Sequence, residues 1–462
     1  MVEPAAPGSH IFSLVRLPRL GAVLLATVLR RGGHDATVQA EVVAPLDLPS
    51  IRSAQLVGIS TITSTAPRSY KLADKLRAAG VPVVLGGPHP TALPDEALGH
   101  ADWVVRGEGE VALPALVTAL EEGGDAASLA RVPGLSWRRE DGVGVHNPVG
   151  PRVTLDALPD PDWRLVRGGD PSGRCAGGTI PMQSSRGCPF ACTFCAVTKI
   201  FGRTMRHRNV DAVVDAVRPY SRRRDAVFFY DDNFAANRDR TAALCEALLR
   251  ANIRHLAWSA QVRADVGADP ELLALMRRAG ARTFYIGLES ADLSTLQAMD
   301  KRQTVSEMRV HLARIRSCGI RVHGMFVLGL DGDTPSTAAA TVQFAIDERL
   351  SSAQFLILIP LPGSQVYEQL CREGRVTQSD WSLFDGHNMV VRPRNFSPQA
   401  LQVAQLDAHA RFYSPRRQLR WLARSELKSA AICHYARRIR RAWDDENRAY
   451  MTNLGAAASG SH

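Results

Sequence analysis

The stretch Arg186-Gly187-Cys188-Pro189-Phe190-Ala191-Cys192-Thr193-Phe194-Cys195 is the most informative part of this 462-residue chain. It places three of the eight cysteines in the spacing C-x3-C-x2-C, directly after a stretch that we predict to be a β-strand. Three thiols so close together, with the other cysteines scattered, argue against a disulfide framework and for a metal site in a reducing compartment. A loop of this kind can wrap around one side of a metal cluster.

Three thiolates suit a [4Fe-4S] cluster whose fourth iron stays open to another ligand, because electron-transfer clusters normally use four cysteines. The alternative is a structural zinc ion, which requires a fourth nearby ligand such as His207 to complete its tetrahedron. We therefore predict that Cys188, Cys192 and Cys195 are metal ligands and, through the cluster, the catalytic residues.

Strands and helices alternate from about residue 180 to residue 370. The repeat of about 25 to 35 residues predicts a full or partial (β/α) barrel of the TIM type, with its active site at the carboxyl ends of the strands. The predicted strands are Ala226–Tyr230, Ala257–Val262, Thr283–Leu288, Arg321–Leu328 and Gln354–Ile359, and the predicted helices are Val210–Tyr220, Asp239–Ala251, Pro270–Ala279 and Val305–Cys318. The barrel is expected to span residues 180–395, and a helical, arginine-rich segment follows over residues 396–462.

The first part of the chain shows the same alternation in a separate unit, so the fold class is α/β throughout. The predicted strands are Ile11–Val15, Thr37–Glu41, Leu56–Ser60, Val83–Gly86 and Trp103–Arg106, with helices Gly21–Arg31 and Pro67–Ala79 between them. This pattern is typical of a doubly wound parallel sheet of the flavodoxin or Rossmann kind, which binds ligands at the carboxyl ends of its strands. We expect this domain over residues 1–145 and a proline-rich linker over residues 146–179.

The cysteine spacing, with the aromatic Phe194 before the third cysteine, resembles the radical S-adenosylmethionine family. The resemblance includes four segments at predicted strand ends, namely Phe228–Phe234, Trp258–Arg263, Gly287–Ser290 and Gly324–Gly329. It implies that S-adenosylmethionine binds against these segments and the cluster. The implied cofactor-binding residues are Phe194, Asp231, Asp232, Gln261, Arg263, Glu289, Ser290 and Gly324.

The side chains in these segments also suit such a ligand physically. The carboxylates of Asp231 and Asp232 suit the ammonium of its methionyl group, and Arg263 suits its carboxylate in a bidentate pair. Glu289 and Ser290 suit hydrogen bonds to a ribose. A single polar residue at a strand end is more often a loop or capping group, and it is the four segments in order that favour a binding site.

The N-terminal domain resembles the cobalamin-binding domains that precede some members of this family. The resemblance is carried by Arg19–Gly21, Gly58–Ser64, Gly86–Pro90 and Arg106–Glu110. Glycines let backbone approach a large flat ligand, and hydroxyl groups bond its amide arms or nucleotide tail. The predicted cobalamin-binding residues are Arg19, Gly21, Ser60, Thr61, Thr63, Ser64, Gly86, Gly87, His89, Gly107 and Glu108.

No histidine is expected to bind cobalt. Many cobalamin proteins use a D-x-H-x-x-G motif for this purpose, and the only near match, Asp385-Gly386-His387, lies far downstream of the domain. His89 either approaches the ligand or belongs to a turn set by its neighbouring prolines, and His34 is expected to be structural. The prediction is base-off cobalamin, and the alternative is a degenerate domain that binds nothing.

The pair of resemblances implies that a 5'-deoxyadenosyl radical, formed from S-adenosylmethionine at the reduced cluster, abstracts hydrogen from a small-molecule substrate. In methylating members the substrate then takes a methyl group from methylcobalamin. We expect methyl transfer to an unactivated carbon or to phosphorus, with flavodoxin or ferredoxin as an electron donor. The alternative is a cyclase or ring-rearranging enzyme, because the same domain pair serves both reactions.

The composition, 45% hydrophobic and 22% charged, is that of an ordinary globular protein. No apolar run is long enough to span a membrane and no signal sequence is recognisable, so we expect a cytoplasmic protein. Much of the net charge of +10 comes from Arg416, Arg417, Arg420, Arg424, Arg437, Arg438, Arg440 and Arg441. Such arginines are usually a solvated helical face, which leaves a cobalamin- or cluster-based sensor that binds nucleic acid as the remote alternative.

Substrate contacts are expected from the C-terminal segment and from the loops Pro360–Ser364 and Trp381–His387. The aromatic residues Tyr367, Trp381 and Phe384 either line a pocket or pack the end of the barrel, and packing is the commoner role for such side chains. The sequence contains no pattern that selects one substrate.

Overall fold

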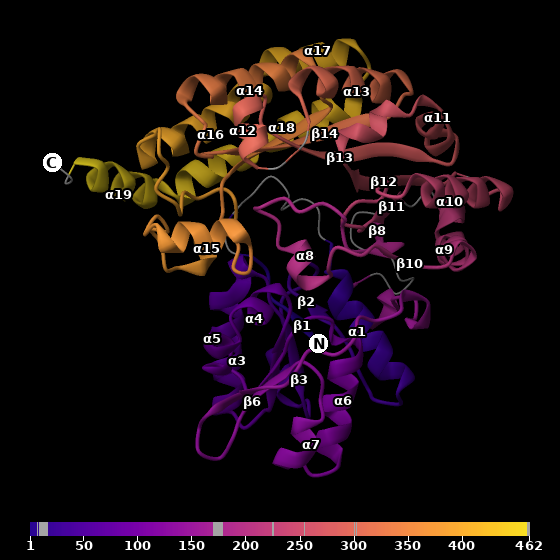
Figure 1. Cartoon of the computed structure of the whole chain (residues 1–462), viewed down its shortest axis with the longest axis vertical. Helices are drawn as coiled ribbons and strands as arrows, with labels where there is room; N and C mark the ends of the chain where they lie inside the picture. The colour runs from indigo at the N-terminus through magenta and orange to yellow at the C-terminus, as the bar shows by residue number, and fades with distance from the viewer. Residues whose placement is uncertain are drawn as a thin grey trace.

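The computed structural model describes residues 1–6, 8, 17–169, 179–223, 226–253, 255–299, 301 and 303–459. Two domains, each built on a mainly parallel sheet covered by helices, lie one above the other (Figure 1). The N-terminal sheet lies in the lower half of that view, the second sheet lies in the upper half, and the last helices pack beside the second sheet.

The N-terminal domain is built on a seven-stranded sheet of order β2-β1-β3-β4-β5-β6-β7. Its strands are β1 (Val2–Glu3), β2 (Gln39–Ala40), β3 (Val57–Ser60), β4 (Val83–Gly86), β5 (Trp103–Val105), β6 (Leu135–Arg138) and β7 (Gly144–His146). The first five pair in parallel, and β6 and β7 join one edge antiparallel. The order 2-1-3-4-5 is the flavodoxin-like one, whose ligand site lies between β1 and β3. The strand predicted at Ile11–Val15 falls outside the described residues.

Helices cover both faces of this sheet because its side chains alternate between two cores. Val83 and Leu85 of β4 pack beneath α3, whereas Val84 between them packs with Leu113 and Leu116 of α6. Figure 1 shows α3 and α6 on opposite sides of the sheet. The helices are α1 (Leu20–Arg31), α2 (Leu48–Arg52), α3 (Ala66–Ala78), α4 (Pro88–Ala92), α5 (Pro94–Leu98), α6 (Gly109–Glu121) and α7 (Ala126–Ala130).

The second sheet is a partial barrel of six parallel strands in sequential order from β8 to β15. Its strands are β8 (Thr179–Met182), β11 (Ala226–Phe229), β12 (Ala257–Val262), β13 (Ala281–Glu289), β14 (Arg321–Leu328) and β15 (Ser352–Ile357). Its helices are α9 (Val210–Val217), α10 (Arg238–Arg250), α11 (Pro270–Arg278), α12 (Leu293–Ala298), α13 (Val305–Ser317) and α14 (Pro335–Asp347). In the described part of the chain β8 and β15 do not pair, so the barrel stays open.

Alternating burial along β12 shows how the barrel divides its side chains. Trp258, Ala260 and Val262 are buried in the core beneath the helices, while Ser259 and Gln261 between them are only partly buried. The side chains of Ser259 and Gln261 therefore point to the concave side of the sheet, where the active sites of barrels lie.

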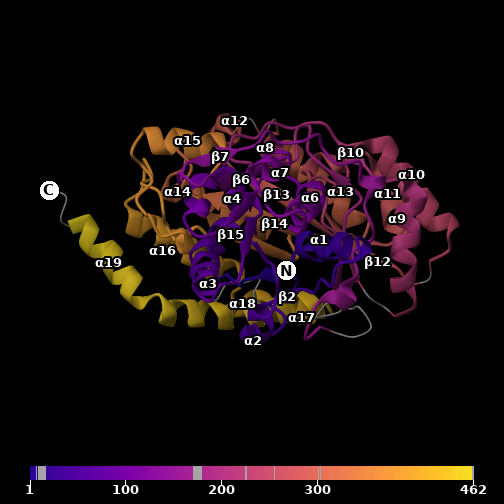
Figure 2. The same cartoon turned by 90° about the horizontal axis from the view of Figure 1, so that it is seen from below.

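The C-terminal helices close one side of the barrel. Helix α16 (Pro398–Phe412) packs on β15, where Gln405 Nε2 donates to Phe355 O at 3.0 Å and the Tyr413 hydroxyl donates to Ala353 O at 2.7 Å. The neighbouring helices are α15 (Gln365–Arg372), α17 (Pro415–Ala423), α18 (Leu427–Glu446) and α19 (Arg448–Ser459). Figure 2 shows α18 and α19 running along one border of the molecule. Among the described residues, no helix combines the length and the apolar character that crossing a membrane requires.

The segment predicted to be a linker is packed against the N-terminal domain. Trp163 and Val166 are buried with Leu20 and Ala26 of α1, and Val38 N donates to Leu165 O at 2.8 Å. Short 3-10 helices complete the chain at η1 (Thr63–Thr65), η2 (Leu155–Ala157), η3 (Trp163–Leu165), η4 (Arg218–Arg223), η5 (Ala264–Ala268) and η6 (Trp381–Leu383).

Candidate active site at the domain interface

The three predicted ligand cysteines lie in one loop between β9 (Ser185–Arg186) and α8 (Val197–Ile200), and all three are partly buried. The segment after α8 supports this loop, because Gly202 O accepts a hydrogen bond of 3.3 Å from Cys188 N. Gly187 has φ of +91°, and a Cβ there would meet Thr204 O at 2.6 Å. A side chain at position 187 would therefore displace the cysteine loop from the backbone of Thr204, against which it packs.

The thiols affect one another electrostatically. Burial raises the pKa of Cys195 to about 11, with further contributions from Cys192 and Cys188, and burial likewise raises the pKa of Cys188. The metal-free thiols of Cys188 and Cys195 are therefore protonated near neutral pH, and metal binding must displace those protons. Three neighbouring, partly accessible thiols in one loop fit a cluster with three thiolate ligands.

The zinc alternative requires a fourth ligand beside the three cysteines. Within the residues that the structure describes, no group of three or more His, Cys, Asp or Glu side chains is placed to hold one metal ion. A cubane cluster makes a different demand, because each of its thiolates binds a separate iron. His207 lies on β10 (Arg206–His207), where burial and Arg240 lower its pKa.

Two basic residues support the cysteine loop from the barrel side. The Arg263 guanidinium lies over the Phe190 ring at 3.9 Å, and its Nη2 donates to Lys301 O at 2.9 Å. Lys301 Nζ lies 5.9 Å from the centre of the Phe194 ring and donates to Glu289 Oε1 at 2.6 Å. The sequence predicted no role for Lys301, because this residue does not directly follow a predicted strand. The predicted residues Phe194, Arg263 and Glu289 are thus brought together beside the cysteines.

We expect Arg263→Ala to weaken S-adenosylmethionine binding by about 1.5 to 3 kcal/mol, the value of a hydrogen bond to a charged group. The reason is that its guanidinium, which also bonds Asp265 at 3.1 Å, lies directly beside the cysteine loop. Isothermal titration of the reconstituted protein measures the dissociation constant. Arg263→Lys is the matched control, since it keeps the charge and loses the planar fork. An unchanged affinity in Arg263→Ala would remove this residue from the site.

The two neighbouring aspartates differ in their surroundings. The Asp231 carboxylate is buried and accepts hydrogen bonds from Ser184 N at 2.7 Å and from the hydroxyls of Ser184 and Ser185 at 2.6 Å each. These hydrogen bonds hold the turn after β8, and cofactor binding by Asp231 stays a prediction. Asp232 accepts from Gly187 N at 3.0 Å, and burial raises its pKa to about 6.

Two other predicted residues also make contacts within the barrel domain. A Cβ on Gly324 would meet Leu350 Cδ1 at 2.5 Å, so this glycine faces the helices and is required for packing. Ser290 is buried, and its hydroxyl accepts from Asp292 N at 3.1 Å. Cofactor binding by Gly324 and Ser290 stays a prediction, because the contacts that the structure shows for both residues lie within the protein. Gln261 does point to the concave side.

A cavity of about 270 Å³ lies between the two domains. The N-terminal domain lines it with apolar strand ends and with Gly21, Gly58, Gly86, Gly87, Gly107 and Gly109. The barrel side lines it with Gln183, Arg186, Ile200, Phe201, Tyr230 and Asp232. Glycines and apolar side chains on one wall, with the aromatic rings of Phe201 and Tyr230 on the other, fit a large flat ligand such as a corrin.

Seven of the eleven residues predicted to bind cobalamin line this cavity, namely Arg19, Gly21, Ser60, Gly86, Gly87, Gly107 and Glu108. The other four, Thr61, Thr63, Ser64 and His89, are buried and do not line it, so contact of these four residues with cobalamin stays a prediction. The first three do not line the cavity because the chain turns away after Ser60 and enters η1. Gly87, with φ of +110°, is needed there because a Cβ would meet Thr61 O at 2.5 Å.

His89 belongs to a separate contact between the N-terminal domain and η6, near the end of the barrel domain. Its Nε2 lies 3.0 Å from Glu96 Oε1, which also accepts from the Tyr70 hydroxyl at 2.9 Å. Trp381 Nε1 donates to Glu96 Oε2 at 3.1 Å, and its ring meets the His89 ring edge-on. We call Tyr70, His89, Glu96 and Trp381 the Glu96 contact. Trp381 therefore packs between parts of the chain, as the commoner role predicted.

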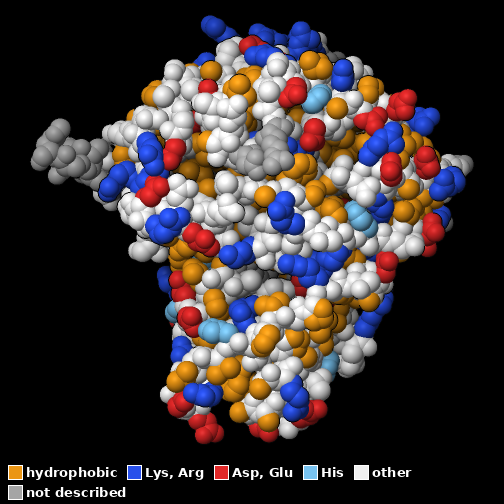
Figure 3. All heavy atoms as spheres, viewed as in Figure 1, with side chains coloured by type: hydrophobic (Ala, Val, Ile, Leu, Met, Phe, Trp, Pro, Cys, Tyr) orange, Lys and Arg blue, Asp and Glu red, His pale blue; other side chains and the backbone are white. Residues whose placement is uncertain are grey.

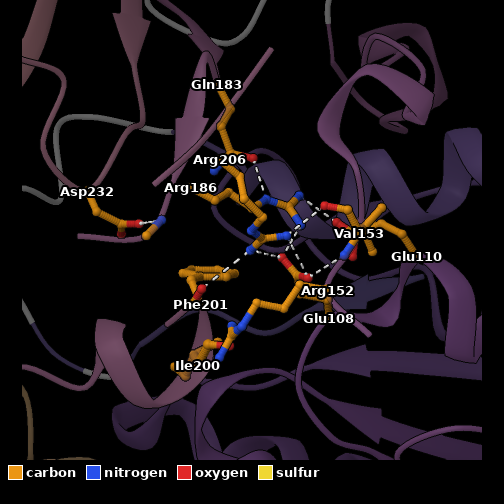
Figure 4. A network of polar contacts seen from close by, with 11 residues as sticks. Glu108, Glu110, Arg152, Val153, Gln183, Arg186, Ile200, Phe201, Arg206 and Asp232 are labelled. Atoms are coloured by element: carbon orange, nitrogen blue, oxygen red, sulfur yellow. Dashed lines mark hydrogen bonds and ion pairs between the residues drawn. The ribbon is translucent and has the colours of Figure 1, made fainter. Parts of the chain in front are cut away.

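A buried ion cluster joins the cysteine loop to the N-terminal domain (Figure 4). Arg186, two residues before Cys188, donates to Glu108 at 2.9 Å and to Glu110 at 2.5 Å. Arg206 donates to both oxygens of Glu108, at 2.7 and 2.9 Å. We call Glu108, Glu110, Arg186 and Arg206 the interdomain ion cluster. It contains two charges of each sign and forms one edge of the cavity.

Charge pairing outweighs desolvation in this cluster. Burial alone raises the pKa of Glu108, but hydrogen bonds from Arg206, Val153 and Arg186 bring the pKa below its usual value. Glu108 is therefore ionised at neutral pH although its side chain is only 7% exposed. Buried charges of this kind tolerate little displacement, so they fix how the cysteine loop sits against the cavity.

Comparisons with known proteins agree with both halves of this site. Residues 182–345 match the model of the radical SAM superfamily, and residues 14–117 match the B12 binding domain. An uncharacterized methyltransferase of Pyrococcus horikoshii is 27% identical over 413 residues, covering 86% of this chain and 88% of that protein. The anaerobic magnesium-protoporphyrin IX monomethyl ester cyclase of Rubrivivax gelatinosus is 27% identical over 422 residues, covering 86% and 74%.

The fold is also that of a solved structure, the radical S-adenosylmethionine methyltransferase TsrM from Kitasatospora setae with cobalamin and a [4Fe-4S] cluster bound. Its TM-score is 0.64 at 19% identity, with 80% of this chain and 77% of that chain covered. The thiol loop, the open barrel and the matched models define the protein as a radical S-adenosylmethionine enzyme. It belongs to the members that carry an N-terminal B12-binding domain, the cobalamin-dependent radical S-adenosylmethionine enzymes.

Proposed function

We propose that the protein transfers a methyl group to an unactivated carbon, or to phosphorus, of a small-molecule substrate. The observation that carries the proposal is the cavity, whose walls come from the N-terminal domain on one side and from the barrel side, including Gln183, Arg186 and Asp232, on the other. The second wall directly precedes the cysteine loop and contacts it, since Asp232 accepts from Gly187 N. A substrate on the concave side of the barrel therefore lies close to both cofactor sites.

The chain's own residues position the cofactors in this proposal. When bound, the cluster supplies the electron that cleaves S-adenosylmethionine, and the corrin supplies the methyl group. Cys188, Cys192 and Cys195 hold the cluster, and the glycine-lined wall holds the corrin. No histidine is among the described residues that line the cavity, which supports base-off cobalamin without a histidine ligand. We place the enzyme in the cytoplasm, where free thiols persist, with a reduced carrier protein as the electron donor.

A cyclase is the second candidate function. It is favoured by the relative named as a magnesium-protoporphyrin IX monomethyl ester cyclase, which matches over 86% of this chain. Both reactions begin with hydrogen abstraction, so they share the cysteine loop and the barrel. They differ in the fate of the methyl group, because ring formation leaves it on its donor.

Labelled S-adenosylmethionine distinguishes the two candidates. The reconstituted protein, with hydroxocobalamin and a strong reductant, is given S-adenosyl-[methyl-2H3]methionine and the small-molecule fraction of a cell extract. We expect a product that gains three deuterium atoms. We also expect 5'-deoxyadenosine and S-adenosylhomocysteine in equal amounts, because each turnover consumes one S-adenosylmethionine to form the radical and one to methylate cobalamin. The triple variant C188A/C192A/C195A is the control. 5'-Deoxyadenosine with a product that carries no deuterium would contradict methyl transfer and favour the cyclase.

A further inference from the structure

Three basic side chains surround the point at which the cysteine loop reaches the surface. Pro189, directly after Cys188, is exposed, and Arg203 Nη2 donates to its carbonyl oxygen at 3.4 Å. Arg152 Nη1 donates to Ile200 O at 2.8 Å. Lys199 lies in α8, and its side chain is 66% exposed. We call Arg152, Lys199 and Arg203 the loop-flanking patch.

The backbone that carries this patch is tied to the cluster loop. Gly202 O accepts from Cys188 N at 3.3 Å, and Gly187 packs against Thr204 O. A Cβ on Gly202 would lie 2.8 Å from Arg152 Cζ, so this guanidinium rests on the same turn. A protein that touches the loop-flanking patch therefore comes within a few bonds of Cys188.

The patch keeps its positive charge. Arg152 and Arg203 are exposed, and no described acidic side chain forms an ion pair with either. Lys199 has one acidic neighbour, Glu368, at 3.4 Å, and that pair is exposed and therefore weak. Figure 3 shows Lys and Arg side chains gathered across the middle of this face, over the region where Figure 1 places α8.

We infer that the loop-flanking patch is the docking surface for an acidic one-electron carrier protein. The inference rests on the proposed function, in which the cluster needs one electron for each cleavage of S-adenosylmethionine. In the docking complex the reduced carrier loses one electron and the cluster gains it, with no bond formed or broken. Complementary charge speeds such encounters, and redox complexes of this type use small interfaces, which three side chains around one loop can anchor.

The test compares two reductants on the full-length, reconstituted protein. The double variant K199E/R203E is mixed either with photoreduced flavodoxin, an acidic one-electron carrier, or with dithionite, and the bleaching of the cluster absorbance is followed by stopped flow. We expect the second-order rate with flavodoxin to fall about tenfold or more and to lose its decrease with added salt. The rate with dithionite is expected to be unchanged. Surface plasmon resonance with immobilised flavodoxin is expected to show the same loss of binding.

A matched control reverses two exposed arginines elsewhere, R250E/R424E, and so changes the net charge equally. If it slows reduction by flavodoxin as much as K199E/R203E does, overall charge and not the patch is responsible, and the inference is overturned. An equal loss with dithionite, or an unchanged rate with flavodoxin, overturns it as well; K199Q/R203Q repeats the test with neutral side chains of similar size. Failure of the proposed function is distinguishable, because it would show as normal cluster reduction without a methylated product.

Discussion

Replacing Cys188, Cys192 or Cys195 with alanine is expected to remove the cluster and, with it, all formation of 5'-deoxyadenosine. Each thiolate holds a separate iron, and two cysteines do not retain a cubane that normally needs at least three protein ligands. Iron and sulfide analysis after anaerobic reconstitution is the measurement, with about four of each per chain expected in the unaltered protein. This is the largest effect expected of any single substitution in the chain.

Cobalamin binding provides the internal standard for that experiment. The cysteines are not among the residues that line the cavity, so the variants are expected to retain the corrin through gel filtration. Cys371→Ala is the matched control, because this exposed cysteine lies in α15, outside the cysteine loop. A full iron complement in the triple variant C188A/C192A/C195A would refute the assignment of these ligands.

Arg186→Met is expected to destabilise the protein by about 3 to 5 kcal/mol, the cost of leaving buried charges without their partner. Arg186 is 5% exposed, and its loss leaves Glu110 with no described ion pair and Glu108 with only Arg206. Chemical denaturation measures the change in the free energy of unfolding. The variant is also expected to lose cobalamin, because Glu108, Glu110 and Arg186 line the cavity.

A second variant distinguishes the effect of the unpaired buried charge from the effect of the altered side-chain shape at the interdomain ion cluster. In R186M/E110Q, an uncharged amide replaces the carboxyl group that would otherwise stay buried without its arginine partner, so much of the lost stability is expected to return. Arg131→Met, which breaks the exposed pair with Glu122, is the matched control and is expected to change stability by less than about 1 kcal/mol. Equal destabilisation by Arg186→Met and Arg131→Met would show that the interdomain ion cluster contributes nothing.

Elements with a strong local pattern could be predicted from the sequence. The strands Val83–Gly86 and Ala257–Val262 agree with β4 and β12 residue for residue, because runs of apolar and small side chains between helices leave little alternative. The first strand could not be predicted, since β1 has only two residues, Val2 and Glu3, and so shows no periodicity. Its place in the sheet depends on pairing with β2 and β3, which no local pattern reports.

The candidate site also contains residues that the sequence predicts and residues that it does not. The cysteines and the glycines of the cavity lie in contiguous motifs, and the structure brings each set together. The sequence predicted no role for Arg186, Lys301 or Tyr230. Their roles arise from contacts between segments that are far apart in the chain. The sequence left His89 open between a ligand contact and a structural turn, and its contact with Glu96 in the next helix is one that no local pattern reports.

Two contacts between distant parts of the chain have a consequence for how the holoenzyme is assembled. The interdomain ion cluster joins the segment that precedes the cysteine loop to α6, and the Glu96 contact joins η6 to α3 and α5. We expect a ligand as large as a corrin to enter while at least one of them is open. Loading of the folded apoprotein is therefore expected to be limited by the rate at which a contact breaks, and to be independent of cobalamin concentration once that concentration is high. Cobalamin supplied during folding would avoid this delay, so the order of events in the cell decides how much of the enzyme is active.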